Sequence, residues 1–305
     1  MILYTPIYNE MPWTPFFLNH LLEYDCPIFI GEGASEVIYD KNPRSTDGSL
    51  ELITRFAEKW KDRVTVINHD YSQRRKGASG KFRPRELVKM QVWNQAVNGE
   101  WIIGLSPDNF YSSEDIRKLK KIIQEVSREK EIYNILTNMK VFVFNFRTII
   151  TRPIIGLCGW WYNLWPFIYK KNPDYIMIPG DELLYEVANS TGRNRRGMIK
   201  DKFEIRDLQA KLKANNPHLY IAKEITNFHY KGLKFLYKYK HRQKKHIFEH
   251  IKSFPLVHEH LIEYEGSHPK VLDGHPWKKV VDCRKIKTAF NYKDFLYLIE
   301  NEKNN

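Results

Sequence analysis

Residues 101–109 read WIIGLSPDN, and this stretch decides the fold class. Its apolar first half predicts a buried strand over residues 101–105, which stops abruptly at Ser106-Pro107-Asp108. A predicted helix over residues 86–97 comes before this strand, and a strongly charged helix that begins at Ser113 and extends through residue 130 comes after it. A buried strand between two helices is typical of βαβ units, in which the strands are parallel.

The same alternation extends back to the N-terminus. Apolar runs predict strands over residues 1–8, 27–30 and 64–68. Apolar residues at helical spacing predict a helix over residues 13–24 and another that opens at the turn of residues 45–48. The first 130 residues therefore predict an α/β fold with a mostly parallel sheet and helices on both faces.

Polar loops follow three of the predicted strands, over residues 31–35, 70–81 and 106–109. Because ligands bind outside the carboxyl ends of the strands in such sheets, we expect the three loops to converge on one site. The second loop and the residues after it are basic, which suits either a diphosphate or an exposed surface. The basic side chains there are Arg74, Arg75, Lys76, Lys81, Arg83 and Arg85.

The second half of the chain is less regular. Residues 138–150 and 220–225 are strand-like, and residues 170–200 are rich in loops. The apolar stretch LLYEV, directly after Asp181-Glu182, predicts a helix, and the Lys-, His- and Tyr-rich stretch after Gly232 predicts further helices. We therefore divide the chain into residues 1–130, residues 131–235 and a mainly helical extension over residues 236–305.

Composition narrows the choice of partners without deciding it. The net charge of +13 favours anionic partners such as nucleic acid, acidic lipid or phosphate-bearing small molecules, or indicates only a lysine-rich surface. The three cysteines form no CxxC pair, so the sequence indicates neither a cysteine zinc site nor a disulfide framework, and a reducing, cytoplasmic setting fits best. The first ten residues do not have the pattern of a signal peptide.

The longest apolar run, residues 154–168, is too short for a spanning helix, which needs about 20 residues. It is rich in tryptophan and flanked by Arg152, Lys170 and Lys171, a composition found both in buried aromatic clusters and in segments at membrane interfaces. A peripheral position on the cytoplasmic membrane face is therefore one hypothesis. Three tryptophans in or near this run could also stack on a sugar acceptor: Trp160, Trp161 and Trp165.

Two separated residues suggest a cation site. Asp108 follows a predicted buried strand, where a carboxylate faces the carboxyl edge of the sheet and could bind Mg²⁺ or Mn²⁺. From this tripeptide alone a helix-cap or turn residue is the favoured interpretation, since Pro-Asp-Asn is common turn chemistry. His229 follows the strand-like residues 220–225, and its imidazole suits Mn²⁺ better than Mg²⁺ if it is a ligand rather than a core side chain. Asp181 or Glu182 could serve as a general base, or both could merely cap a helix.

Taken in order, several short motifs resemble the family 2 glycosyltransferases. They are PIYNE at residues 6–10, STDGS at 45–49, NQA at 94–96 with GEWI at 99–102, SPD at 106–108, HYKGLK at 229–234 and YEGSHP at 264–269. The last two are similar to the HYG-x-(V/L)-(K/R) and F-x-G-(T/S)-HP motifs of a bacterial-type subgroup. Together the motifs span about residues 4 to 270.

The resemblance implies a GT-A fold, a Rossmann-like sheet that binds a nucleotide-diphosphate sugar. Residues 1–130 would then be the nucleotide-sugar half and residues 131–235 the acceptor half of one catalytic domain. It also implies a cation, Mn²⁺ or Mg²⁺, bound by Asp108 and His229, with Ser106 standing where the family has the first acid of its D-x-D motif. The catalytic base would be Asp181 or Glu182. Contacts with the donor are implied for Pro6, Tyr8, Glu10, Glu32, Asp47, Arg85, Ser106 and Asp108.

The expected activity is inverting transfer of a sugar from this donor to a hydroxyl of a saccharide, lipid-linked or protein acceptor. One alternative is a nucleotidyltransferase on a similar sheet, but that chemistry typically needs two acids for its metals and only Asp108 is well placed. Another is a non-catalytic protein that binds nucleic acid through its positive charge and aromatic residues. The basic residues are scattered rather than clustered, so we do not expect a nucleic-acid partner.

Overall fold

The computed structural model describes most of the N-terminal half of the chain and separate parts of the rest. The described residues are 1–33, 42, 44–68, 84–129, 131–142, 145–150, 164–171, 175–176, 185–186, 219–230, 233 and 261–279. The basic residues 74–83, the proposed base Asp181 or Glu182, and Trp160 and Trp161 lie outside them.

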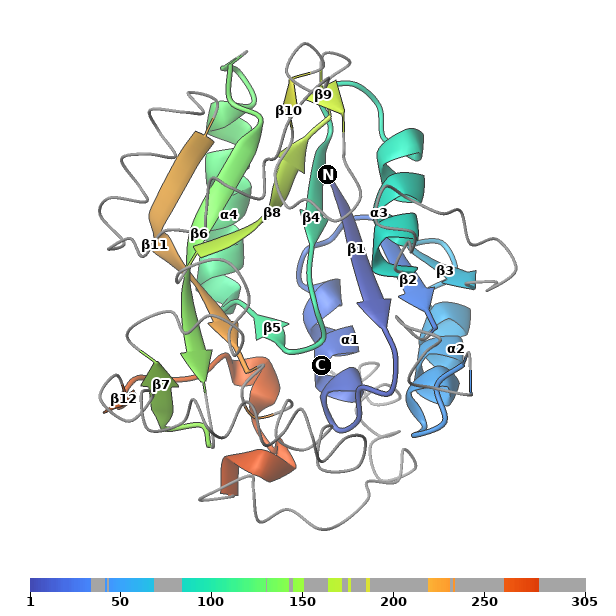
Figure 1. Cartoon of the computed structure of the whole chain (residues 1–305), viewed down its shortest axis with the longest axis vertical. Coiled ribbons are helices and arrows are strands. Elements are labelled where there is room, and N and C mark those ends of the chain that lie inside the picture. The colour runs from blue at the N-terminus through green and yellow to red at the C-terminus, as the bar shows by residue number, and fades with distance from the viewer. Residues whose placement is uncertain are drawn as a thin grey trace, which may run out of the picture.

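Strands and helices alternate through the first 126 residues, as the sequence predicts (Figure 1). The elements are β1 (Ile2–Ile7), α1 (Trp13–Leu22), β2 (Ile28–Glu32), α2 (Ser49–Lys59), β3 (Val64–Asn68), α3 (Pro84–Gln95), β4 (Trp101–Gly104), β5 (Asn109–Phe110) and α4 (Ser113–Val126). The helices α2 and α4 are amphipathic: the apolar residues at helical spacing, such as Leu52 and Phe56 in α2, are buried while the charged ones are exposed. Ser112 caps α4 by accepting a hydrogen bond from the Asp115 amide at 3.0 Å.

The described part of the second half is mainly β-structure. Its elements are β6 (Asn134–Phe142), β7 (Thr148–Ile150), β8 (Leu164–Lys170), β9 (Tyr175–Ile176), β10 (Tyr185–Glu186), β11 (Leu219–His229), β12 (Leu261–Glu263) and the 3-10 helices η4 (Lys270–Leu272) and η5 (Pro276–Lys279). The helix predicted for LLYEV is wrong at Tyr185 and Glu186, which pair with Ile176 and Tyr175 in a two-stranded antiparallel sheet. A stretch of five residues is too short for its periodicity to distinguish a helix from a strand, and tyrosine favours strands.

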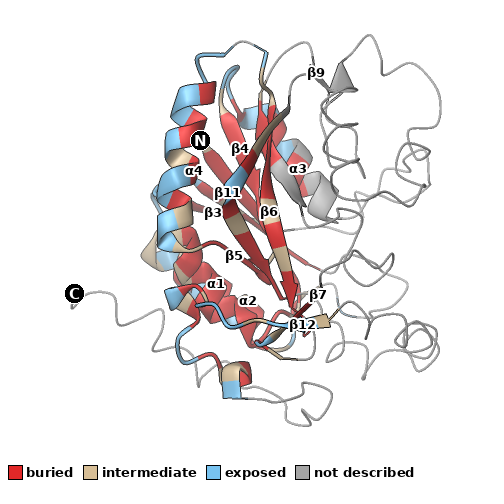
Figure 2. Ribbon diagram, turned by 90° about the vertical axis from the view of Figure 1, so that its left-hand side faces the viewer, coloured by how far each residue is buried: buried red, intermediate tan, exposed pale blue. Residues whose placement is uncertain are grey.

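One mixed, largely parallel sheet forms the centre of the molecule. Its strands follow the order β12-β7-β6-β8-β4-β1-β2-β3, and β11 pairs with both β6 and β5. The α/β class is thus confirmed. So are helices on both faces, because α1, α2 and α4 lie on one side of the sheet and α3 on the other (Figure 2). No helix in the described ranges is long and apolar enough to cross a membrane.

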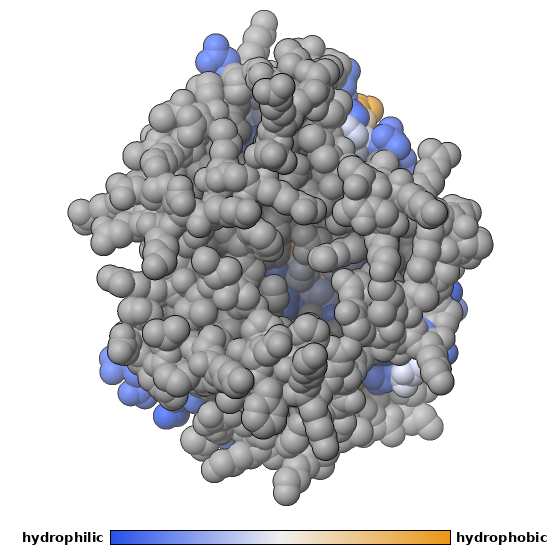
Figure 3. Space-filling view, viewed as in Figure 1, coloured by the Kyte–Doolittle hydropathy of each residue, from blue (hydrophilic) through white to orange (hydrophobic). Residues whose placement is uncertain are grey.

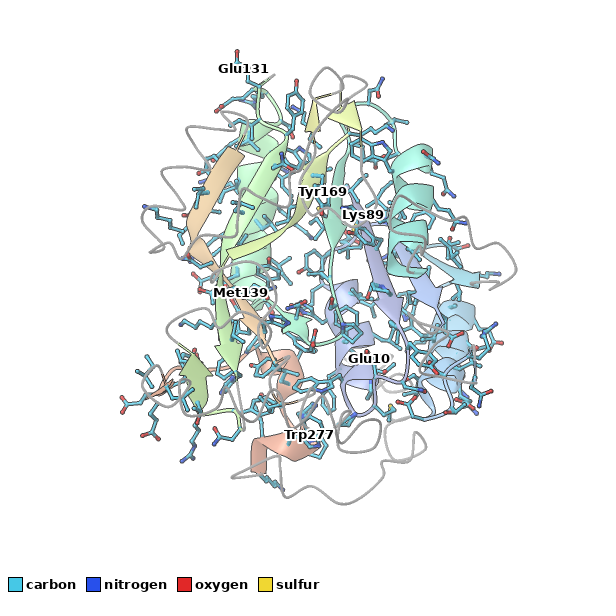
Figure 4. The ribbon with its side chains drawn as sticks, in the orientation of Figure 1. Glu10, Lys89, Glu131, Met139, Tyr169 and Trp277 are labelled. Carbon is cyan, nitrogen blue, oxygen red and sulfur yellow. The ribbon has the colours of Figure 1, made fainter. Side chains whose placement is uncertain are left out.

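The helix α3 packs on its face of the sheet through a buried lysine. Lys89 is buried, and its Nζ lies 4.6 Å from the centre of the Tyr169 ring on β8. The two residues are labelled in Figure 4. An ammonium group over an aromatic face is a favourable cation–π contact, strengthened where water is excluded.

The position of Gly104, the last residue of β4, leaves no room for a side chain, because the ring of Tyr4 on β1 lies against it. A Cβ on Gly104 would lie 2.5 Å from both Cζ and the hydroxyl oxygen of the buried Tyr4 ring. We therefore expect Gly104→Ala to lower the free energy of unfolding by about 1–3 kcal/mol, the usual cost of overpacking, as measured by urea denaturation. The matched control is Tyr4→Leu, which shortens the opposing side chain. The double variant should lose clearly less than the sum of the two single losses, and simple additivity would contradict this explanation.

Candidate active site

The carboxyl ends of the main strands meet at one edge of the sheet. The strands β1, β2, β3 and β4 are mutually parallel, and β8 is antiparallel to both β4 and β6. Therefore β6 runs in the same direction as β4, and β11, which is parallel to β6, does so too. In Figure 1 the arrows of β1 and β6 both point to the lower edge. Side chains that follow these strands belong to that edge.

Asp108 and His229 come together at this edge although 121 positions separate them. Asp108 lies in the turn between β4 and β5, and His229 is the last residue of β11. His229 Nε2 lies 3.8 Å from Asp108 Oδ1, and both residues are buried. The cation role of the pair remains a prediction, but the closeness that this role requires is present.

Backbone pairing fixes the two residues relative to each other. The strand β5 is antiparallel to β11, with Asn109 opposite His229 and Phe110 opposite Phe228. One residue further along, the Tyr230 amide donates a hydrogen bond to the Asp108 carbonyl at 2.8 Å. The carboxylate and the imidazole are therefore carried by a short antiparallel pair, not by independent loops.

Two buried asparagines near this pair are hydrogen-bonded to each other. Asn109 Nδ2 donates to Asn227 Oδ1 at 3.0 Å, and neither side chain is exposed. Asn109 also closes the turn that precedes it. Its backbone N–H donates to the Ser106 carbonyl at 2.8 Å, and its side-chain Oδ1 accepts a hydrogen bond from the Ser106 backbone N–H at 3.3 Å. Sequence reasoning missed this contact. The available signal was an asparagine within two residues of each proposed ligand: Asn109 directly after Asp108, and Asn227 two residues before His229.

The loop after β1 is bound to the start of α2. The Glu10 amide donates to Ser49 Oγ at 3.0 Å, and the Met11 amide donates to Asp47 Oδ2 at 2.9 Å. Asp47 Oδ1 also accepts from the Ser49 amide at 3.0 Å. The Tyr8 hydroxyl donates to the Asn42 carbonyl at 2.9 Å. The motifs at residues 6–10 and 45–49 thus form one structural unit, with Glu10 at the lower edge of the sheet in Figure 4.

Glu32, predicted to contact the nucleotide base, is engaged within the chain. It ends β2 and is completely buried. Its Oε1 accepts a hydrogen bond from the Ser45 amide at 2.7 Å, and its Oε2 is paired with the Arg44 guanidinium. In this arrangement Glu32 holds the loop that leads to α2. Glu32 itself is closed off from solvent, whereas the guanidinium-bearing side chain of Arg44 is partly exposed.

The remaining predicted donor contacts have different settings. Pro6 lies in β1 opposite Gly31 of β2. Arg85 belongs to the first turn of α3, and the placement of its side chain is not described. In Figure 3 the described residues visible near the centre of this face of the molecule are hydrophilic.

The segment of residues 264–279 packs against the end of β11 through aromatic side chains. The Tyr230 hydroxyl and His268 Nδ1 are 2.7 Å apart. Trp13, the first residue of α1, stacks with Tyr230 at a ring separation of 5.2 Å, and its ring centre is 4.2 Å from that of His275. Trp277 meets Trp13 edge to face at 5.6 Å and lies at the lower edge of Figure 4. The motif around His268 is visible in the sequence, but nothing in it predicts the contact with Tyr230.

Burial keeps both histidines of this segment neutral. Burial, followed by the nearby charge of Lys278, lowers the pKa of His268 to about 4. The same two causes hold the pKa of His275 well below its usual range. A buried imidazole that cannot accept a proton at neutral pH acts as a hydrogen-bonding group and not as a charge.

These lowered pKa values predict a loss of stability in mild acid. The unfolded chain binds protons at these histidines near pH 6.5 and the folded chain does not, so the free energy of unfolding should decline as the pH falls from about 6.5 toward 4. Urea denaturation at pH 7, 6 and 5 measures this decline. In His275→Asn, whose amide can still accept the bond that the Trp277 amide donates to His275 Nδ1 at 3.2 Å, the decline should be shallower. Equal slopes in the two proteins would contradict the assignment.

The chain matches no protein-family model and no curated protein. Within the described ranges, no group of three or more His, Cys, Asp or Glu side chains could hold a metal ion. A cation held by the Asp108 and His229 pair would therefore need further ligands from a bound substrate, from water or from residues outside those ranges.

Proposed function

We propose that the protein is a glycosyltransferase that moves a sugar, with inversion, from a nucleotide-diphosphate donor to an acceptor hydroxyl. The observation that carries the proposal is the buried pair of Asp108 and His229 at the carboxyl edge of a sheet whose strands β3, β2, β1 and β4 are adjacent and parallel. Nucleotides bind outside this edge in open α/β sheets. The finer assignment, a GT-A fold, is part of the same proposal.

The donor set of this pair fits a divalent cation. A carboxylate oxygen and an imidazole nitrogen suit Mn²⁺ in particular. The two donor atoms lie 3.8 Å apart, close enough for both residues to approach a single ion. With two ligands from the described residues, further coordination positions would be left for diphosphate oxygens, for water or for residues outside the described ranges.

The proposed chemistry assigns separate tasks to the residues of the chain. Asp108 and His229 would hold the cation, which when bound stabilises negative charge on a departing nucleoside diphosphate as a Lewis acid. Arg44, held by Glu32, offers guanidinium donors at the carboxyl end of β2. Asp181 or Glu182 remains the proposed base that takes the proton from the acceptor hydroxyl.

A thermal-shift experiment on the full-length chain tests the proposal. UDP, GDP, ADP, CDP and dTDP are each added with and without MnCl₂, because a ligand that binds only the folded state raises the melting temperature. We expect one nucleotide to raise it only when Mn²⁺ is present. The shift should disappear in Asp108→Ala and His229→Ala and persist in the surface control Asp62→Ala. No Mn²⁺-dependent shift with any nucleotide would contradict the proposal.

The reaction products separate this function from its nearest rival. Incubation with the sugar conjugate of the binding nucleotide and Mn²⁺ should release the nucleoside diphosphate. Release of pyrophosphate from a nucleoside triphosphate and a sugar phosphate would instead favour a nucleotidyltransferase.

A further inference from the structure

Tyr230 joins the two proposed cation ligands to the segment of residues 264–279. Its amide donates to the Asp108 carbonyl at 2.8 Å, and it directly follows His229 in the chain. Its side-chain hydroxyl lies 2.7 Å from His268 Nδ1, in the segment of residues 264–279. A change at His268 therefore reaches both proposed ligands through a single residue.

The Tyr230 ring is held in one orientation by its aromatic neighbours. It is completely buried and stacks with Phe142 at a ring separation of 4.6 Å and an interplanar angle of 17°. Phe146 and Trp13 enclose it at ring separations of 4.7 and 5.2 Å. In a close-packed cluster a ring keeps one orientation, so the hydroxyl can satisfy its hydrogen bond only with a group placed where His268 lies.

The protonation states of Tyr230 and His268 bear on which of the two groups donates this hydrogen bond. Burial raises the pKa of Tyr230 well above its usual range and lowers the pKa of His268 to about 4, so both groups are neutral at pH 7. The backbone of Phe146 also hydrogen-bonds His268. A neutral imidazole donates from one nitrogen and accepts at the other. With the Phe146 backbone as the acceptor for the imidazole N–H, Nδ1 is left to accept the Tyr230 O–H.

We propose that His268 is a positioning residue for the cation site, fixing the end of β11 through Tyr230 so that His229 stays in register with Asp108. The inference rests on the proposed function, since it takes this pair to be the cation ligands. Loss of this hydrogen bond, by removal of either the Tyr230 hydroxyl or the His268 acceptor, leaves one polar group without its partner and removes a link between the end of β11 and the segment of residues 264–279. Because Tyr230 is joined covalently to His229 and through its amide to the Asp108 carbonyl, a displacement of the backbone at residue 230 is transmitted to both ligand residues.

The test measures Mn²⁺ binding to the full-length chain, from the electron paramagnetic resonance signal of free Mn²⁺ in a titration with MnCl₂. Each titration contains UDP, GDP, ADP, CDP or dTDP at one saturating concentration. Tyr230→Phe and His268→Ala should each weaken Mn²⁺ binding about 10–100-fold, the usual effect of losing a group that orients a ligand. His268→Asn, whose amide oxygen can replace Nδ1 as the acceptor, should bind Mn²⁺ within about threefold of the unchanged protein.

Two comparisons separate positioning from a purely structural role. The double variant Tyr230→Phe with His268→Ala should bind Mn²⁺ no more weakly than the weaker single variant, because both changes remove one bond. Asp273→Ala breaks the exposed pair of Asp273 with Lys278, 2.7 Å apart in the same segment, and should leave Mn²⁺ affinity unchanged. Circular dichroism at the assay temperature establishes that each variant is folded, and Tyr230→Phe, which keeps the ring, carries the test if His268→Ala does not fold.

Unchanged Mn²⁺ affinity in folded Tyr230→Phe would overturn the inference while leaving the proposed function intact. Failure of the unchanged protein to bind Mn²⁺ with any of the five nucleotides would instead overturn both. The two failures are therefore distinguishable in one set of titrations.

Discussion

Asp108→Asn is expected to lower the rate of sugar transfer at least about a hundredfold. The substitution keeps the size of the side chain and removes the negative charge that would hold a divalent cation. A Lewis acid at a departing diphosphate contributes several kcal/mol to the transition state, and each 1.36 kcal/mol is about tenfold in rate. Steady-state release of nucleoside diphosphate at saturating MnCl₂ measures the loss.

The control for this variant is Asp62→Asn, which makes the same chemical change on the exposed turn after α2. It should leave the rate within about twofold, as surface substitutions usually do. Raising the MnCl₂ concentration should recover part of the Asp108→Asn activity if the defect lies in cation binding. Full activity of Asp108→Asn at the lowest useful MnCl₂ concentration would remove this residue from the proposed site.

Trp13→Ala is expected to lower the free energy of unfolding by about 3–5 kcal/mol, the range for truncating a buried tryptophan. Trp13 is fully buried where α1, β5, β11 and the segment of residues 264–279 meet. Its ring lies 4.2 to 6.0 Å from the rings of Phe110, Phe146, Tyr230, His275 and Trp277. The cavity would therefore remove partners from several elements at once. Urea denaturation at pH 7 provides the measurement.

Trp60→Ala is the matched control for that experiment. Trp60 follows α2, is only partly buried, and has Lys59 and Arg63 over its ring at 5.6 and 5.9 Å. Exposed cation–π pairs contribute about 0.5–1 kcal/mol, so its loss should be clearly smaller. An equal loss of unfolding free energy in the two variants would show that the aromatic cluster around Trp13 stabilises the fold no more than a surface tryptophan does.

The local elements of the N-terminal half were predictable because each has a strong pattern of its own. The strand β3 was predicted with the bounds that it has, and the turn at residues 45–48 leads directly into α2 at Ser49. Alternation of strand and helix then implied a parallel sheet. These inferences depend only on residues close together in the chain.

The parts that build the candidate site were less predictable because they depend on distant pairing. The strand β5 has two residues, too few to show a period, and its partner β11 is more than a hundred residues away. No local pattern indicates that Asn109 and Asn227 meet, or that Tyr230 bonds His268. The order of short family-like motifs suggested that Asp108 and His229 share a site, whereas each residue taken alone favoured a turn or a core interpretation.

The central claim is that Asp108 and His229 bind one cation together with a nucleoside diphosphate. Pulsed electron paramagnetic resonance of Mn²⁺, recorded on the full-length chain with the nucleotide selected by thermal shift, tests it most directly. We predict couplings to one imidazole nitrogen and to phosphorus in the same spectrum, with the nitrogen coupling lost in His229→Gln. A spectrum with phosphorus but no nitrogen coupling in the unchanged protein, identical to that of Mn²⁺ and the nucleotide in buffer, would contradict the claim.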